Sequence, residues 1–209
     1  MSLFEQQLRE ETPRSLKALR EAENACRRCD LYKFATQAVP GEGPAHAPLM
    51  LIGEQPGNDE DLDGHPFVGP AGRVLDKALE EAGIDRKEVF VTNAVKHFKH
   101  EMRGKRRLHK RPDPGEIEAC RWWQHIEREL VKPKLMVALG ATAARSVFER
   151  VITINKVRGE VRPVPDGGNA LVTIHPSYLL RLQEERDKRH EYAKFIADLE
   201  TARDFLRAG

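Results

Sequence analysis

Four short runs of apolar residues recur along this chain, and longer stretches separate them in which apolar and charged residues mix at helical spacing. The runs cover residues 49–52, 89–94, 135–139 and 170–174. Mainly apolar runs of this length predict strands that are buried on both faces, as the strands of parallel sheets are. We therefore expect a central, mainly parallel sheet of four strands.

Helical patterns lie between and after these predicted strands. They cover residues 74–82, 114–130, 141–148 and 186–206. Gly83 is a typical end for the first of them. Asp113, Pro114 and Glu116 mark the start of the second, because proline suits the first helical position and the carboxylate is placed for a capping box. Strands that alternate with helices predict a three-layer α/β/α fold with helices on both faces of the sheet.

The two remaining long segments differ in character. Residues 3–29 read as helical, with Pro13 separating an entry turn from the main helix. The polar segment 96–112 has no consistent period, so we expect a loop there. We expect a single domain over residues 1–209, in which residues 1–35 form an N-terminal helical segment.

Length and composition restrict the class of protein. A chain of 209 residues with 40% apolar content can bury the core of one domain. No segment approaches the roughly 18 apolar residues that a membrane span needs, and the charged N-terminal residues do not resemble a signal sequence. We therefore expect a cytoplasmic protein of a bacterial cytosol or nucleoid, monomeric and without membrane contact. The net charge is only +2, so any attraction to nucleic acid must come from local clusters of cations.

Glycines, carboxylates and one aromatic residue crowd the loop that follows the first predicted strand. Residues 53–72 contain Gly53, Glu54, Gln55 and Phe67. Loops at the carboxyl ends of parallel strands form the usual ligand crevice of open α/β sheets, and the next helix would direct its amide end at a ligand there. The alternative is an acidic, well-solvated surface loop, which gives Phe67 no role. The segment therefore favours a binding loop.

Three cysteines form a pattern typical of metal ligation. Cys26 and Cys29 are spaced so that one metal centre accepts both thiolates, and Cys120 offers a third. An odd number of cysteines without secretory features argues against a set of disulfides. The spacing does not distinguish zinc from an iron-sulfur cluster, since both accept sulfur and nitrogen ligands. The alternative is a redox-active CxxC pair with an unrelated buried Cys120, although such a pair normally follows a strand.

The segment 105–111 is the main cluster of cations. Five of its seven residues are Lys or Arg, and the other two are Leu108 and His109. This density suits contacts to phosphate, whereas a solvated basic loop is the ordinary alternative. The like charges around His109 should disfavour its protonation, so that the ring is neutral near neutral pH and able to act as a nucleophile.

Four separated motifs occur in the order in which a known family has them. They are the Gly53 loop, the segment Val-Thr-Asn-Ala-Val-Lys at 91–96, the cysteine pattern, and His175-Pro176-Ser177. Over roughly residues 26–180 the chain resembles the uracil-DNA glycosylase superfamily, specifically its iron-sulfur family 4. The resemblance implies a hydrolase of base excision repair that removes uracil from DNA by cutting the bond between base and deoxyribose.

The same resemblance implies a cofactor. Members of family 4 hold a 4Fe-4S cluster with four cysteines. Two of these ligands correspond to Cys26 and Cys29, and the other pair corresponds to His97 and Cys120. His97 therefore stands where the family has a cysteine. A cluster with three thiolates and one imidazole is chemically acceptable.

Two departures from the family 4 pattern, His97 and the long basic segment before Cys120, resemble the UdgX branch. Members of that branch excise uracil and stay bonded to the abasic sugar through a loop histidine. The resemblance puts His109 in the position of the nucleophile. We therefore expect an enzyme that ends as a covalent adduct with C1′ of the deoxyribose in uracil-containing DNA, single- or double-stranded.

The candidate residues take separate roles in such a mechanism. Phe67 stacks on the extruded uracil, and Asn93 offers a donor and an acceptor that match its O4 and N3–H. His175 donates to O2, where negative charge builds as the base departs. Glu54 stabilises the sugar cation and accepts the proton that His109 sheds. The other polar groups expected around the base are Gln55, Asp61 and Gly53.

Contacts to the DNA strand are expected from the basic segment and from the residues after the fourth strand. These are Lys105, Arg106, Arg107, Lys110, Ser177 and Leu179. Leu179 is a candidate wedge into the base stack, although a helix core residue suits the sequence equally well. Two other functions stay open. One is a conventional glycosylase in which water attacks and the basic loop only grips phosphate, and the other is a non-catalytic binder of single-stranded or damaged DNA.

Overall fold

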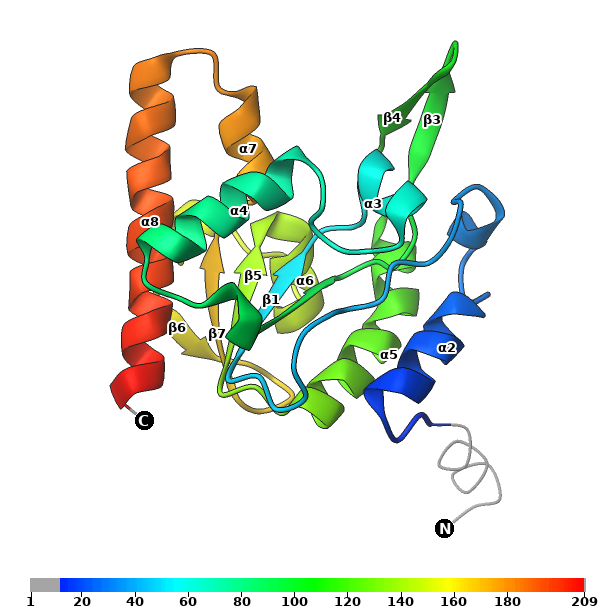
Figure 1. Cartoon of the computed structure of the whole chain (residues 1–209), viewed down its shortest axis with the longest axis horizontal. Helices are drawn as coiled ribbons and strands as arrows, with labels where there is room; N and C mark the ends of the chain where they lie inside the picture. Colours follow the sequence, from blue (N-terminus) through cyan, green and yellow to red (C-terminus); the bar gives the residue numbers. More distant parts are fainter. Residues whose placement is uncertain (1–11, 209) are drawn as a thin grey trace.

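A five-stranded sheet forms the centre of the computed structural model, which describes residues 12–208 (Figure 1). In spatial order its strands are β2 (Val89–Asn93), β1 (Leu49–Gly53), β5 (Leu135–Leu139), β7 (Asn169–Thr173) and β6 (Val161–Pro163). The first four are parallel, as the apolar runs predicted, and β6 pairs antiparallel with β7. The prediction of four strands was wrong because β6 is a three-residue strand of valine, arginine and proline, which form no apolar run.

Helices cover both faces of this sheet (Figure 1), which confirms the predicted three-layer arrangement. Side chains alternate between the faces, so Leu49 and Leu51 of β1 lie on one side and Met50 and Ile52 on the other. The first side is covered by α4 (Pro70–Glu81), α7 (Pro176–Arg181) and α8 (Glu185–Ala208). The second side is covered by α6 (Gly140–Phe148) and the end of α5 (Pro114–Val131).

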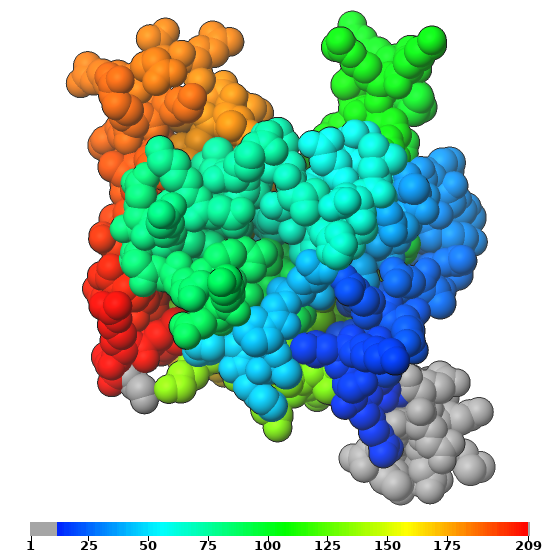
Figure 2. All heavy atoms as spheres, in the orientation of Figure 1, coloured from blue at the N-terminus to red at the C-terminus, as the bar shows by residue number. Residues whose placement is uncertain are grey.

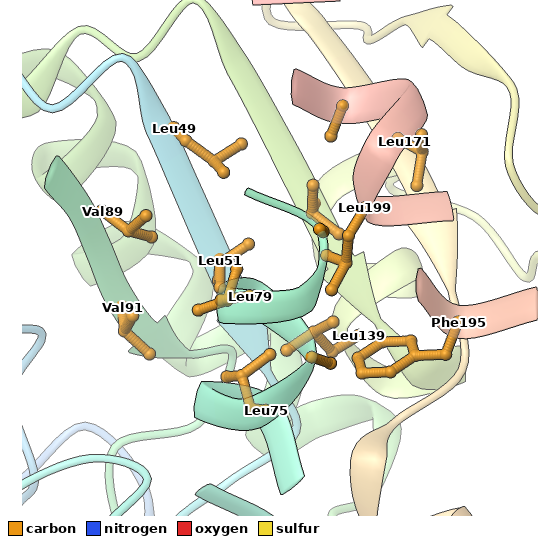
Figure 3. Close-up of a cluster of buried hydrophobic side chains, with 14 of the residues drawn as sticks. Leu49, Leu51, Leu75, Leu79, Val89, Val91, Leu139, Leu171, Phe195 and Leu199 are labelled. Carbon is orange, nitrogen blue, oxygen red and sulfur yellow. The ribbon is translucent and has the colours of Figure 1, made fainter. Parts of the chain in front are cut away.

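The core on the first side is built mainly from aliphatic side chains (Figure 3). Leu75 and Leu79 lie one turn apart on α4, and Phe195 and Leu199 lie one turn apart on α8, so each helix presents an apolar stripe to the sheet. Leu179 of α7 joins the same cluster. This packing holds α7, which begins directly after β7, against the sheet.

The N-terminal helix, α2 (Leu16–Asn24), is shorter than predicted. It begins after Ser15, whose side chain accepts a hydrogen bond from the backbone N–H of Ala18. The part of the predicted helical segment before residue 12 lies outside the described residues. α2 packs on α5 through a third apolar cluster, which includes Leu19 and Trp123. The segment that follows α2 is thereby held beside α5.

Local chemistry sets the starts of α5 and α4. α5 begins as predicted, because the Asp113 carboxylate accepts from the backbone N–H of Glu116 at 3.0 Å and the Glu116 carboxylate accepts from the N–H of Asp113 at 2.7 Å. α4 begins at Pro70, earlier than the predicted residue 74, since proline suits the first turn. The pattern missed several short helices, which are α3 (Asn58–Asp63) and the 3₁₀ turns Asp30–Lys33, Arg86–Glu88 and Ile154–Lys156.

A hairpin occupies the segment for which a loop was predicted. β3 (His100–Arg103) and β4 (Arg106–His109) pair antiparallel, with Gly104 in the left-handed backbone conformation at the turn. The prediction was wrong because most side chains of these strands are exposed, so no alternation of apolar and polar residues marks them. The hairpin projects from the body of the molecule (Figures 1 and 2).

The last helix, α8, is long but carries charged side chains along most of its length. Within residues 12–208, no helix combines the length and the apolar content that crossing a membrane requires.

Candidate active site

The carboxyl ends of the parallel strands open into one pocket of about 1060 Å³. Glu54 follows β1, Asn93 ends β2 and His175 follows β7. Phe67 reaches the pocket from the loop after β1, and His109 reaches it from the end of β4. Five residues that the sequence proposed for different steps of one reaction therefore line a single cavity.

Glu54 and His109 approach each other across this pocket. Glu54 Oε1 lies 3.3 Å from His109 Nε2. The His109 ring is half-exposed and lies obliquely beside the ring of Phe98. A carboxylate next to an imidazole suits both the stabilisation of a cationic sugar and the uptake of a proton from the ring.

The pKa of His109 lies below its ordinary value of 6.5. Burial is the main cause, and the positive charge of Arg181 lowers the pKa further, whereas the Glu54 carboxylate raises it. The ring is therefore neutral near neutral pH, in the direction predicted. The cause differs from the prediction, because the cation that acts on His109 comes from α7 and not from the basic segment.

The absence of a side chain at Gly53 lets Asn93 and Phe67 come together. A Cβ atom at Gly53 would lie 2.3 Å from Asn93 Oδ1 and 2.6 Å from Phe67 Cζ. Phe67 also has a positive φ of 59°, which is uncommon for an aromatic residue and marks a backbone held by its surroundings. Its ring stacks on His175, with 6.0 Å between the ring centroids. The loop thus places an amide and two rings at one end of the pocket.

His175 caps α7 and points its free nitrogen away from that cap. Nδ1 accepts a hydrogen bond from the backbone N–H of Ser177 at 3.2 Å, which puts the proton of the neutral ring on Nε2. Burial is the main cause that lowers the pKa of His175 to about 4, and the positive charge of Arg181 and repulsion from His109, when that ring is protonated, lower it further. His175 is therefore a neutral donor at physiological pH, as its proposed role requires.

The side chain of Gln55 holds the hairpin and is not free to hold a base. Its amide nitrogen donates to the backbone carbonyls of Lys99 at 3.1 Å and Lys110 at 3.0 Å, and its oxygen accepts from the N–H of Lys99 at 3.1 Å. These three hydrogen bonds hold together the two backbone segments at the foot of the hairpin, one at Lys99 and the other at Lys110. The expected contact between the Gln55 side chain and uracil is therefore wrong, whereas a contact through the Gln55 backbone stays a prediction, and the residue lines the pocket.

Asp61 also serves the hairpin and not the base. Its side chain is fully buried outside the pocket lining and accepts from the backbone N–H of Thr36 at 3.0 Å and from Arg107 Nη1 at 2.5 Å. Arg107 Nε donates in addition to Asn58 Oδ1 at 2.9 Å. Two predictions are thereby corrected: Asp61 does not face the base, and Arg107 is engaged with protein groups instead of being available to phosphate.

The other cations of the basic segment are exposed. Lys105 and Arg106 lie at the turn of the hairpin, and Lys110 lies at its foot, where its Nζ is 2.8 Å from Glu101 Oε2. An exposed ion pair of this kind is weak and exchanges readily for a phosphate contact. The structure thus leaves the tip of the hairpin open to an anionic partner (Figure 2).

The opposite side of the pocket is formed by α7, where one prediction was wrong. Leu179 is 2% exposed and packs in the core, so it is not a wedge into DNA. Its neighbours Tyr178 and Leu180 are 39% and 45% exposed and line the pocket together with Ser177 and Arg181. The helical period explains the error, because successive residues of a helix are rotated by about 100°, so the neighbours of a buried residue turn out of the core.

The three cysteines lie in or against the third apolar cluster, between α2 and α5. All of them are free thiols. Cys29 and Cys120 are hydrogen-bonded to each other, which lowers the pKa of Cys29 to about 7, and the indole N–H of Trp123 lies 3.1 Å from Cys26 Sγ. Residues 94 positions apart in sequence, Cys26 and Cys120, are thus gathered in one place.

His97 fits the donor set of the implied cluster. Its side chain is 2% exposed, its Nδ1 has no hydrogen-bond partner among the described residues, and burial lowers its pKa to about 4. A neutral, unpartnered imidazole nitrogen and three thiols match the chemistry of a sulfur-nitrogen site. Within residues 12–208, however, no three His, Cys, Asp or Glu side chains are arranged to hold a metal ion. The types of donor fit, whereas a closed ligand geometry is not found in that part of the chain.

Sequence reasoning missed two residues that contact this site. Thr142 Oγ1 donates to Glu54 Oε2 at 2.6 Å, and Arg111 Nε lies 3.4 Å from the same hydroxyl. A signal for Thr142 was available, because it lies in the first turn of α6, directly after the carboxyl end of β5. Arg111 follows His109 closely and carried no signal beyond its charge.

Comparisons with known proteins point to one family. Residues 40–200 match the Uracil DNA glycosylase superfamily. The Type-4 uracil-DNA glycosylase of Archaeoglobus fulgidus is 35% identical over 182 residues, which cover 84% of this chain and 88% of that protein. The Type-4 enzyme of Thermotoga maritima is 36% identical, covering 87% and 90%, and that of Sulfurisphaera tokodaii is 38% identical, covering 86% and 85%.

Proposed function

This chain belongs to the uracil-DNA glycosylase superfamily, and on that basis we propose that it excises uracil from DNA and then bonds covalently to the abasic site through His109. The Type-4 relatives support the excision step. The observation that supports the covalent step is the distance of 3.3 Å between His109 and Glu54, in the pocket that also holds Asn93, Phe67 and His175.

The substrate base leaves the DNA stack and enters this pocket. Extrusion of a base requires a few kcal/mol of unstacking energy. Stacking on the ring of Phe67 offsets part of it, since base-aromatic stacking contributes about 1 to 3 kcal/mol in proteins that bind single strands. Asn93, 2% exposed at the end of β2, offers the amide donor and acceptor that match O4 and N3–H of uracil and mismatch the amino group of cytosine.

Departure of the base puts negative charge on uracil and positive charge on the sugar. The Nε2 proton of neutral His175 is placed to donate to O2 of the leaving base. The Glu54 carboxylate stabilises the sugar cation. A lone pair of the neutral His109 ring forms the bond to C1′ as the glycosidic bond breaks, and the electrons of that bond leave with uracil. The imidazolium product then sheds its remaining ring proton, for which Glu54 is the acceptor we propose.

We propose that Cys26, Cys29, Cys120 and His97 hold a 4Fe-4S cluster. The grouped thiols and the unpartnered His97 nitrogen support this assignment. When bound, the cluster supplies a covalent link between segments that are distant in sequence. That link fastens the segment after α2 and the start of the hairpin segment to α5.

Substrate DNA, single- or double-stranded, lies between two walls in this proposal. Lys105 and Arg106 on the hairpin supply phosphate contacts on one side. Tyr178, Leu180 and Arg181 of α7 supply the other side. The hairpin and the turn between α7 and α8 project on the same side of the molecule in Figure 2. We propose that one monomer is sufficient for this grip.

Incubation with a uracil-containing oligonucleotide, followed by denaturing electrophoresis, tests the function. We expect a band of protein joined to DNA that survives denaturation with wild type and is absent with H109A. An alkali-labile product without such a band supports the conventional turnover enzyme instead. The absence of both the joined band and the alkali-labile product supports a non-catalytic DNA binder. An adduct that persists in H109A shows that another residue is the nucleophile.

The conventional turnover enzyme is the second candidate, and the comparisons favour it specifically. Three relatives that are 35% to 38% identical and cover 84% to 87% of this chain are described as Type-4 uracil-DNA glycosylases. In such a reaction, water takes the place of His109 and Glu54 positions that water. The same pocket, base contacts and leaving-group donor serve both reactions, so the fate of C1′ separates them.

A further inference from the structure

The hydroxyl of Thr142 is a buried polar group whose hydrogen-bonding capacity is directed at the active site. Thr142 is fully buried in the first turn of α6. Its Oγ1 donates to Glu54 Oε2 at 2.6 Å and faces the donor nitrogen Nε of Arg111 at 3.4 Å. Because Thr142 lies in the first turn of α6, no complete helical turn precedes it, and its hydroxyl bonds Glu54 instead of a carbonyl of its own helix.

This contact leaves the two oxygens of Glu54 with different tasks. Oε2 is held by Thr142, and Oε1 lies 3.3 Å from His109 Nε2. A carboxylate held at only one oxygen by a short, charge-assisted hydrogen bond keeps its plane fixed while the other oxygen faces the reacting groups. Without the hydroxyl, rotation of the Glu54 side chain would change the distance to His109.

The same hydroxyl ties together three segments that meet at the pocket. Glu54 follows β1, Thr142 belongs to the helix after β5, and Arg111 follows β4 of the hairpin. His109 and Arg111 are close in sequence. The contact between Arg111 and Thr142 therefore holds the segment that contains His109 against α6. The weak geometry of that contact, at 3.4 Å, makes the bond to Glu54 the principal one.

We propose that Thr142 is a positioning residue that sets the orientation of Glu54 toward His109 and the sugar. The inference rests on the proposed function, because it assigns to Thr142 a part in the step that Glu54 assists. Thr142 touches neither the base nor C1′ in this account. Its effect acts entirely through the carboxylate.

Three variants test this role. T142V replaces the hydroxyl with a methyl group of similar size, and T142S keeps the hydroxyl. S146A is the matched control, because Ser146 lies on the same helix, is buried, and donates to Gln124 Oε1 at 3.0 Å without contacting Glu54. Single-turnover rates of uracil release and adduct formation are measured for each, with thermal melting to verify folding. If T142V does not fold, T142A replaces it.

We expect T142V to slow both steps by about tenfold or more, since bonds to charged groups are among the stronger hydrogen bonds in proteins. T142S should recover most of the wild-type rate of uracil release and adduct formation. S146A should melt at a lower temperature than wild type but keep both wild-type rates. Wild-type rates in T142V, or equal losses in T142V, T142S and S146A, would overturn the proposal. A wild-type protein that neither releases uracil nor forms an adduct refutes the proposed function instead.

The pH dependence provides a readout that a purely structural role would not change. The charged groups that act on His109 are Glu54 and Arg181. If Thr142 holds the Glu54 carboxylate near the ring, T142V weakens that influence, and the acidic limb of the adduct-forming rate should move to lower pH. T142S should restore the wild-type limb. A limb that stays in place, or moves to higher pH, contradicts the assignment.

Discussion

At the scale of the residue, the close approach around Gly53 is the most demanding feature of the pocket. A methyl group there would lie 2.3 Å from Asn93 Oδ1 and 2.6 Å from the ring of Phe67. We expect G53A to reduce uracil release by on the order of 100-fold, because displacements near 1 Å in a positioning contact have effects of that size. G115A is the control, since its Cβ would lie 3.4 Å from Asp113 Oδ1, an ordinary contact. Equal rates in the two variants would contradict this account.

The protonation of His109 makes a second prediction at this scale. Adduct formation needs the neutral ring, and the pKa of His109 lies below 6.5. The rate should therefore fall to half of its plateau only at a pH below 6.5. In R181Q the acidic limb should move to higher pH, because the charge of Arg181 lowers that pKa. Measurement of the adduct-forming rate as a function of pH tests the predictions for wild type and for R181Q. A wild-type rate already halved at pH 6.5 would refute the prediction for wild type.

Individual residues differ in how far their roles were predictable. Asn93 and His175 end or follow apolar strands, so their convergence on one edge of the sheet follows from parallel pairing. Gln55 and Asp61 sit in the same loop, but the pattern does not indicate which way a loop side chain turns, and both turn to the hairpin. Thr142 was missed because a single hydroxyl early in a helix has many ordinary explanations.

At the scale of the element, the hairpin carries His109 and is held by residues from outside it. Arg107 contacts Asp61 and Asn58, and its guanidinium lies 5.5 Å from the centre of the Phe98 ring. We expect R107A to leave the hairpin loosely attached, so that its amides exchange hydrogen faster and adduct formation slows by about tenfold. Hydrogen-exchange mass spectrometry and the single-turnover rate measure the two effects.

R106A is the matched control for that prediction. It removes the same charge from the exposed turn of the hairpin. Amide exchange in the hairpin should then remain as in wild type, while binding of DNA weakens and its dependence on salt becomes less steep. If R107A and R106A behave alike in exchange, the contact to Asp61 does not hold the hairpin.

Elements were predictable where local chemistry specifies them. The start of α5 follows from its capping residues, and the buried strands follow from mainly apolar runs. The hairpin was not predictable in this way, because its strands are exposed and its shape depends on contacts to Gln55 and Asp61 outside it. The edge strand β6 is too short to have a period.

At the scale of the whole molecule, the proposed cluster joins the N-terminal segment to the body that carries the site. We expect the protein, purified without oxygen, to be brown and to contain iron. C120S should lose iron and melt at a lower temperature, because α2 and the segment after it would lose the link to α5 that the cluster supplies. Metal analysis with melting curves tests this. A colourless protein that contains zinc would refute the iron-sulfur assignment.

The fold of the whole molecule was largely predictable, since alternating strands and helices restrict the connections of a parallel sheet. The arrangement of the pocket between the hairpin and α7 was not. It depends on a projection with no hydrophobic signal and on a helix of six residues, in which only Pro176 and Leu179 are buried.

Mass spectrometry of the protein after exposure to uracil-containing DNA reports whether His109 becomes bonded to the abasic sugar. We expect a mass increase equal to the oligonucleotide without its uracil, and, after digestion of protein and DNA, a deoxyribose remnant attached to the peptide that contains His109. Free uracil together with an unmodified His109 peptide, or the remnant on a different residue, would contradict it.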